Sequence, residues 1–269
     1  MPTWNATHLS AQHTSQTELR ILHQDDHLVA VCKPPGMLVH RTAMDAPDTQ
    51  SVARLLRAQL GREVFAVHRL DKGTSGVLLF ALDAPTARDI TGQFESGQVR
   101  KTYHAMVRGW PPESGTIDHP LKREDEGRHH TLRRDLVQEA VTHFRTLHRF
   151  SLPMADVRSN GQRFEHTRIA LVELCPATGR RHQLRRHMKH IAHPLLGDAT
   201  HGKGPLNRAV AEHLGLNRLW LHASGLEWPA LPASDAPFKP LRIDCAHGFE
   251  NTFHELRTCL TPHVPHIQP

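Results

Sequence analysis

The segment from His68 to Gly76, with the sequence HRLDKGTSG, constrains the fold of this chain more than any other. An apolar run, VLLFA, follows it directly over residues 77–81. Glycine permits backbone conformations closed to other residues, and such an apolar run is typical of a buried strand that leaves a turn. The segment therefore predicts a tight turn that holds Asp71 at the rigid edge of a strand. A carboxylate in this place can act as a nucleophile, or it can cap the turn or pair with Arg69.

Further motifs stand in the order found in a known enzyme family. The segment resembles the signature HRLD-x-x-TSG of the RluA-type pseudouridine synthases. The other matching blocks are KPPG at 33–36 with VH at 39–40, KTY at 101–103, and ELCPATGRRHQLR at 173–185. The resemblance extends from about residue 19 to about residue 250. Within the family it is greatest for members that act on tRNA at position 65.

The resemblance implies an α+β protein with the pseudouridine synthase fold. This fold has a long, mixed, largely antiparallel sheet, flanking helices and loops, and a central catalytic cleft. The order of the elements agrees, because strands and helices do not alternate as in a doubly wound fold. We expect a flexible tail over 1–18, one catalytic domain over 19–260 without an S4 RNA-binding domain, and a second tail over 261–269.

Local patterns predict individual elements. Strands are expected at 21–22, 28–31, 77–82, 101–107, 169–174, 219–223 and 241–244. Helices are expected at 51–60 with Ser51 as N-cap, at 85–96 with Asp83 as N-cap, after Gly179, at 207–216 and at 250–260. Residues 111–138 and 153–166 are rich in charge and turn formers, and they predict loops or insertions.

The charge distribution favours a polyanionic partner. Lys and Arg exceed Asp and Glu by six, and there are 24 histidines. The stretch from Thr178 to His193 holds five Lys or Arg residues and no acid, and such clustering says more about nucleic-acid binding than net charge does. No apolar run approaches the roughly 18 residues of a membrane span, and the first 18 residues lack the apolar centre of a signal peptide. We therefore expect a cytoplasmic, RNA-binding protein.

The four cysteines, Cys32, Cys175, Cys245 and Cys259, are widely scattered and include no C-x-x-C pair. This spacing favours reduced thiols over a disulfide framework or a thiolate metal site.

Three residues are the candidates for catalysis. The resemblance implies that Asp71 is the catalytic aspartate and that Arg180, in the TGR element, is its charge partner. A cation would keep a desolvated carboxylate ionised; the alternative for Arg180 is a phosphate contact. Tyr103 is the only tyrosine in the chain and stands at the family's K-x-Y position, where its ring could stack on the base and its hydroxyl move a proton. The alternative is a core tyrosine on a strand.

A second group is predicted to bind the substrate. Arg69 is the candidate to enter the RNA as the target uridine leaves the stack, or else it contacts a phosphate. Lys101, Arg181 and Arg185 are predicted backbone contacts, as are Arg186 and Lys189 on the same basic helix. Leu174 and Leu184 are predicted to line or support the pocket, with core packing as the alternative. His68 completes the predicted binding set: His68, Arg69, Lys101, Leu174, Arg181, Leu184 and Arg185.

The sequence gives little support for a metal or another cofactor. His182, His187, His190, His193 and His201 lie close in sequence, but there is no H-E-x-x-H element and the neighbouring arginines would repel a cation. We expect an isomerase that needs no cofactor, membrane or obligatory protein partner and acts as a monomer on RNA, most of all tRNA. The alternatives are an enzyme of the same family acting on ribosomal RNA and a non-catalytic RNA-binding or folding factor.

Overall fold

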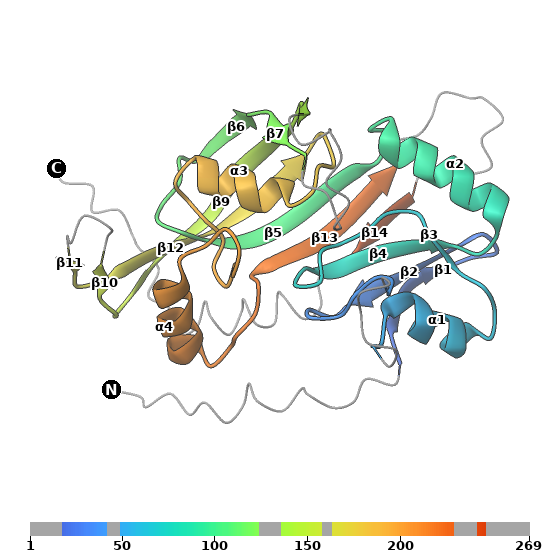
Figure 1. Cartoon of the computed structure of the whole chain (residues 1–269), viewed down its shortest axis with the longest axis horizontal. Coiled ribbons are helices and arrows are strands. Elements are labelled where there is room, and N and C mark those ends of the chain that lie inside the picture. Colours follow the sequence, from blue (N-terminus) through green and yellow to red (C-terminus); the bar gives the residue numbers. More distant parts are fainter. Residues whose placement is uncertain (1–17, 42–48, 124–135, 158–162, 229–240, 246–269) are drawn as a thin grey trace. The chain divides into compact units, whose positions relative to one another are not determined.

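The computed structural model describes residues 18–41, 49–123, 136–157, 163–228 and 241–245 (Figure 1). Its contacts divide the chain into two compact units. The first comprises residues 1–103 and 211–245, and the second comprises 104–210 and 246–269. Strand β5 (Arg100–Arg108) contains the boundary between residues 103 and 104, and helix α4 (Gly204–Leu214) contains the boundary between residues 210 and 211. The described residues include no helix that is long and apolar enough to cross a membrane.

The first unit is built around the strand that leaves the Asp71 turn. Its elements are β1 (Arg20–Gln24), β2 (Leu28–Lys33), α1 (Val52–Leu60), β3 (Phe65–Ala66), β4 (Ser75–Ala81), α2 (Ala84–Glu95), β13 (Leu221–Trp228) and β14 (Leu241–Asp244). Strand β2 pairs antiparallel with β1 and with β4, and β3 pairs antiparallel with β4. Strand β13 pairs parallel with β4 and antiparallel with β14.

Every residue of β4 is buried, and alternate side chains enter two different apolar clusters. Leu78 and Phe80 pack in the cluster that includes Leu56 of α1. Leu79 packs in the cluster that includes Ile90 of α2. Figure 1 shows the two helices on opposite sides of β4. This burial on both faces explains why residues 77–81 are uniformly apolar.

Both helices of the first unit begin where their caps predict. Ser51 accepts a hydrogen bond from the Arg54 amide at the start of α1, and Gly61 ends this helix in the left-handed conformation. Asp83 accepts from the Thr86 amide at the start of α2. The predicted strands at 21–22 and 28–31 are confirmed as β1 and β2, which pair with each other antiparallel.

The second unit contains long antiparallel strands. Its elements are β6 (Ser114–Asp118), β7 (Leu121–Lys122), β8 (Val137–Gln138), β9 (Val141–Leu152), β10 (Asp156–Val157), β11 (Arg163–Phe164), β12 (Thr167–Pro176) and α3 (Gln183–His190). Strand β9 pairs antiparallel with β12 and with β6, while β7 pairs with β8 and β10 with β11. The prediction that 111–138 and 153–166 are loops was wrong for β6 and for these short strand pairs. Backbone pairing stabilises them despite a polar sequence.

The predicted α+β class with a mixed, largely antiparallel sheet is confirmed. Within the units, the β4 and β13 pair is parallel and the other named strand pairs are antiparallel. The prediction of one catalytic domain over 19–260 stays a prediction. Both predicted tails, apart from Glu18 of the first, and the predicted helix at 250–260 lie outside the described residues.

Candidate active site

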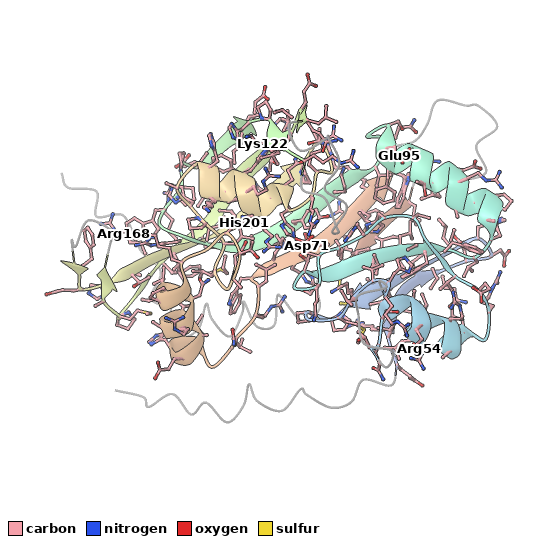
Figure 2. The ribbon with its side chains drawn as sticks, in the orientation of Figure 1. Arg54, Asp71, Glu95, Lys122, Arg168 and His201 are labelled. Carbon is pink, nitrogen blue, oxygen red and sulfur yellow. The ribbon has the colours of Figure 1, made fainter. Side chains whose placement is uncertain are left out.

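Asp71 lies on a tight turn directly before β4, where Figure 2 labels it. The carbonyl oxygen of Asp71 accepts a hydrogen bond from the Thr74 amide at 3.0 Å, which closes the turn. The Asp71 side chain is half-buried, whereas Thr74 is 2% exposed. The backbone of the turn is therefore anchored in the unit while the carboxylate remains near solvent.

The buried ammonium group of Lys33 holds this turn from the inside. Its Nζ donates to the carbonyl oxygens of Lys72 at 3.0 Å, Thr74 at 2.7 Å and Pro34 at 2.9 Å. The residue is fully buried. Burial lowers the pKa of Lys33 to about 7, against the opposing effect of the nearby Asp71 charge. The sequence marked this lysine only as part of the KPPG block; its role as an anchor of the Asp71 turn was missed.

A second network lies at Ser75, where the turn passes into β4. Arg218 Nη2 donates to Ser75 Oγ at 2.6 Å, and Ser75 Oγ lies 2.7 Å from His222 Nδ1. His222 Nε2 lies 2.8 Å from the carbonyl oxygen of Cys245. Because a carbonyl can only accept, His222 carries its proton on Nε2 and Nδ1 accepts from the Ser75 hydroxyl. Arg218 and His222 were not singled out in the sequence, and only the paired strands β4 and β13 bring them to this turn.

Tyr103 belongs to the same unit as Asp71 and packs against the apolar cluster beneath α1. Burial raises the pKa of the Tyr103 hydroxyl, and the negative charge of Asp71 raises it further. The two predicted catalytic residues therefore lie within electrostatic range of each other. The tyrosine stays protonated at neutral pH.

His68 and Lys101 also lie together in this unit. The His68 ring stacks on Phe94 of α2 with 4.5 Å between the ring centroids, and its Nε2 accepts from the Leu79 amide at 3.0 Å. Burial, together with a smaller effect of the Lys101 charge, lowers the pKa of His68 to about 3. His68 is thus a neutral imidazole that holds β4, although the sequence predicted a substrate contact. The substrate contact of His68 stays a prediction.

Arg69 is exposed on the surface just before the turn. Its charge is one of those that lower the pKa of His40, after burial of the imidazole and the charge of Arg57. This position is compatible with either predicted role, entry into RNA or contact with a phosphate.

Arg180 lies in the second unit, on a turn organised by Gln183. Gln183 Oε1 accepts from the Arg180 amide at 2.9 Å and from Thr178 Oγ1 at 2.7 Å. Its Nε2 donates to the Val141 carbonyl at 2.9 Å, which ties the turn to β9. Gln183 was missed in the sequence, although a glutamine at the first position of an otherwise basic helix was a usable signal.

The Arg180 side chain lines a basic hollow of the second unit. Its Nε donates to the Glu139 carbonyl at 2.9 Å. The hollow is lined by Lys122, Arg123, Gln138, Gly179, Arg180, Arg181 and Arg186. Five of these seven residues carry a positive charge and none is acidic, so the hollow suits a phosphate group. Lys122 and Arg123 were missed because they belong to a segment that the sequence predicted to be a loop.

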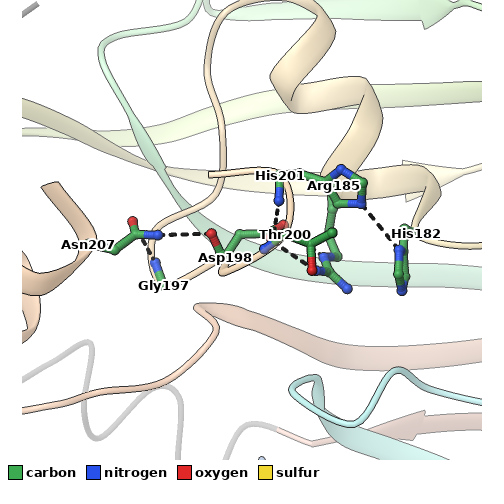
Figure 3. A network of polar contacts seen from close by, with 7 residues as sticks. All are labelled: His182, Arg185, Gly197, Asp198, Thr200, His201 and Asn207. Atoms are coloured by element: carbon green, nitrogen blue, oxygen red, sulfur yellow. Dashed lines mark hydrogen bonds and ion pairs between the residues drawn. The ribbon is translucent and has the colours of Figure 1, made fainter. Parts of the chain in front are cut away.

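Arg185 is buried and forms a bidentate ion pair with Asp198, with Nε to Oδ2 at 2.7 Å and Nη2 to Oδ1 at 2.8 Å. Figure 3 shows that Asp198 also contacts the loop that follows it in the chain. Its Oδ1 accepts from the amides of Thr200 and His201, each at 2.9 Å. These bonds hold the pKa of Asp198 below its ordinary value despite burial. The pair fixes the 198–201 loop against α3.

The remaining predicted residues of the second unit are mostly internal. Leu174 on β12 is fully buried and Leu184 on α3 is 7% exposed, so both belong to the core. Among the clustered histidines, His182 contacts His201, whereas His190 stacks on His119. Among the described residues, no group of three or more His, Cys, Asp or Glu side chains could hold a metal ion.

Comparison with known proteins shows which enzyme family the chain matches. The family model described as RNA pseudouridylate synthase matches residues 27–190. The chain is 48% identical to tRNA pseudouridine synthase C of Vibrio cholerae over 78% of this chain and 85% of that protein. It is also 48% identical to the Yersinia pestis protein of the same name, over 77% of this chain and 80% of that one.

Solved structures show the same fold. Human RNA pseudouridylate synthase domain containing 1 matches with a TM-score of 0.68 at 24% identity, over 93% of this chain and 91% of that one. Human RNA pseudouridylate synthase domain containing 4 matches with a TM-score of 0.63 at 30% identity, over 91% of this chain and 94% of that one.

Proposed function

Because this chain belongs to the RNA pseudouridylate synthase family, we propose that it isomerises a uridine of tRNA to pseudouridine with Asp71 as the nucleophile. The relatives named tRNA pseudouridine synthase C support tRNA as the substrate. The sequence resemblance makes position 65 the proposed target. One observation carries the proposal: Asp71 stands on a turn anchored by buried Lys33, and its charge acts on Tyr103.

The reaction breaks the bond between the sugar and N1 of the base, rotates the base, and rejoins it through C5. N1 gains a proton and C5 loses one, so atoms and electrons balance without a redox partner or phosphate energy. A half-buried carboxylate on a rigid turn can form the covalent intermediate, by adding to the pyrimidine ring or by attacking the sugar carbon. Anchoring of the backbone directly after Asp71, at Lys72 and Thr74, keeps the carboxylate oxygen aligned through both bond changes.

Tyr103 is proposed to hold the base and to assist the final proton transfer. Since burial and the Asp71 charge both raise its pKa, the hydroxyl keeps its proton at neutral pH. A neutral phenol can donate a hydrogen bond to the base while its ring stacks on the pyrimidine. A tyrosinate in the same place would repel Asp71.

Arg180 is proposed as the charge partner of Asp71 on the strength of the TGR motif. The two residues belong to different compact units, and the sequence resemblance is what supports this pairing. The basic hollow around Arg180 supports a role of the second unit in binding phosphates. Arg185 is not proposed as an RNA contact, since its guanidinium is buried and paired with Asp198.

The proposed RNA contacts are Arg69, Lys101, Lys122, Arg123, Arg181 and Arg186. Arg69 is exposed next to the catalytic turn and is proposed to fill the gap left by the extruded uridine. The other cations would neutralise phosphates and read no sequence. We propose that the enzyme acts in the cytoplasm as a monomer, without a metal or other cofactor.

The central test is the Asp71→Asn variant, assayed on an unmodified tRNA transcript. Pseudouridine is measured by chemical derivatisation and primer extension, and RNA affinity is measured by filter binding. We expect loss of product with affinity within about threefold, because the amide keeps the shape but loses the nucleophile. Asp89→Asn, at an exposed position on α2, is the matched control and should retain full activity. Full activity of Asp71→Asn would refute the proposal.

A competition between tRNA and ribosomal RNA transcripts tests the substrate. Product in the tRNA alone is expected, and product in the ribosomal RNA alone would replace the tRNA assignment with the ribosomal one. Binding without product in either RNA would favour a non-catalytic RNA-binding factor. Affinity should also fall steeply with salt, since phosphate contacts release counterions.

A further inference from the structure

The thiols of Cys32 and Cys245 meet behind the catalytic turn, although 213 positions separate them in the sequence. Cys245 Sγ lies 2.9 Å from Cys32 Sγ. Cys32 is on β2 and half-buried, and Cys245 follows β14 and is 1% exposed. Neither cysteine forms a disulfide bond in this structure. The two sulfur atoms are therefore close enough for a disulfide to form with a small approach.

The backbone on each side of this pair is fixed. Cys32 lies within the antiparallel ladder, opposite Val77 of β4. The Cys245 amide donates to the Ser224 carbonyl at 2.8 Å, and its own carbonyl accepts from His222 Nε2 at 2.8 Å. A disulfide bond is about 2.0 Å long, so closure needs the sulfur atoms to approach by roughly 0.9 Å. Side-chain rotation can supply this without a change in strand pairing.

Cys32 is the more reactive of the two thiols. The hydrogen bond from the Cys245 thiol lowers the pKa of Cys32, and the positive charges of Arg20, Arg218 and Lys33 lower it further against the effect of burial. A thiolate is the nucleophilic form of cysteine. Cys32 is also the partly exposed residue of β2, whereas the rest of that strand is buried. An oxidant can therefore reach Cys32 before it reaches Cys245.

We propose that Cys32 and Cys245 form an oxidisable dithiol that closes to a disulfide when a hydroperoxide reacts at Cys32. The Cys32 thiolate attacks one peroxide oxygen, the O–O bond breaks, and the departing hydroxide takes up a proton and leaves as water. Cys32 is then a sulfenic acid. The Cys245 thiolate attacks this sulfur, the S–O bond breaks, and the second oxygen leaves as water with the Cys245 proton. Two thiols and hydrogen peroxide thus yield one disulfide and two water molecules.

The disulfide would connect two parts that both support the Asp71 turn. Lys33, next to Cys32, donates to the carbonyls of Lys72 and Thr74. Cys245 accepts from His222, which in turn accepts from Ser75 at the start of β4. The disulfide would therefore link two of the segments that support the catalytic turn. The inference is independent of the proposed function, because disulfide formation is measured on the protein alone.

Peptide mapping tests the linkage directly, because each cysteine lies on its own tryptic peptide. Cys32 falls in 21–41, since trypsin does not cut the bond between Lys33 and Pro34, and Cys245 falls in 243–257. After treatment with hydrogen peroxide and alkylation of the remaining thiols, a linked 21–41/243–257 species is expected, and dithiothreitol should remove it. Alkylation of both cysteines to the level of the untreated protein, or linkage of either one to Cys175 or Cys259, would overturn the proposal.

Two single variants test the order of events. In Cys245→Ser the reaction should stop at the sulfenic acid of Cys32, which dimedone traps. In Cys32→Ser dimedone should not label Cys245. Labelling of Cys245 in Cys32→Ser, together with no labelling of Cys32 in Cys245→Ser, would contradict the assignment of Cys32 as the attacking thiol.

The thermal unfolding temperature distinguishes a disulfide from a sulfenic acid, because only the disulfide links two segments of the chain. Oxidised wild type should unfold at a temperature higher by roughly 5 °C or more, since the link closes a long loop in the unfolded chain. Cys175→Ser, on β12 of the second unit, should show the same rise and serves as the control. A fall in the unfolding temperature on formation of the disulfide would contradict the fit inferred from the two sulfur positions.

Discussion

The neutral state of His68 predicts how the stability of this protein depends on pH. The folded pKa is about 3, because burial against Phe94 and the charge of Lys101 both disfavour the imidazolium. The pKa in the unfolded chain is about 6.5. Between these two values the unfolded chain binds the extra proton, so the free energy of unfolding falls as the pH falls. The contribution is fully present above about pH 6.5 and is lost toward about pH 3.

The magnitude at a given pH between the two pKa values follows from how far that pH lies below the unfolded pKa of about 6.5. At about pH 5 the unfolded imidazole is almost fully protonated and the folded one almost fully neutral. The loss relative to neutral pH is therefore about 1.36 × 1.5, or roughly 2 kcal/mol. The hydrogen bond of His68 also predicts lower stability at low pH, because a protonated Nε2 could no longer accept from the Leu79 amide.

The assay compares urea unfolding of wild type and His68→Gln at about pH 7.5 and pH 5. Glutamine does not titrate, yet its Oε1 can still accept from the Leu79 amide. The variant should lose about 2 kcal/mol less than wild type on acidification. His213→Gln, at an exposed position on α4, is the control and should behave as wild type does. An equal loss in wild type and His68→Gln would refute the assignment of a neutral imidazole.

Three further predictions follow from single contacts. Because Tyr103 is the only tyrosine, an ultraviolet titration should show one phenol with a pKa above the ordinary value of about 10. Asp71→Asn should lower that pKa, because it removes the nearby negative charge. An unchanged titration midpoint in the variant would mean that the Asp71 charge does not act on Tyr103. Gly76→Ala should destabilise the fold by about 3 kcal/mol or more in urea unfolding, since φ is 109° and a Cβ would strike the backbone of β13. Asp198→Asn should lower the free energy of unfolding by about 3–5 kcal/mol, because it leaves the Arg185 charge buried without its carboxylate. A decrease of less than about 1 kcal/mol would mean that the pair is solvated.

The sequence predicted local structure well wherever the cause of that structure is local. The cap residues Ser51 and Asp83 each provide a side-chain acceptor for the first free amides of a helix, and both helices begin there. The apolar run at 77–81 predicted a buried strand, because only a strand covered on both faces needs such a run. The family motif, with its ordered blocks, predicted the fold that the comparisons confirm.

Prediction failed where pairing partners decide the structure. The strands at 121–122 and 137–138 stabilise each other across a polar segment, and neither has an apolar pattern of its own. Strand β9 carries histidines and arginines between its apolar residues, yet it pairs along its length with β12. Backbone hydrogen bonds between strands are largely independent of side-chain identity, so the sequence shows them weakly.

The sequence by itself determined that this chain carries Asp71 on a glycine-bearing turn before a buried strand, because motif, turn chemistry and apolar pattern all act over a few residues. Only the tertiary structure decided what stands behind that turn. The ammonium of Lys33, the chain from Arg218 through Ser75 to His222, and the thiols of Cys32 and Cys245 come from four distant segments. Strand pairing brings them together, since burial of a polar group is tolerated only where the fold supplies its partner.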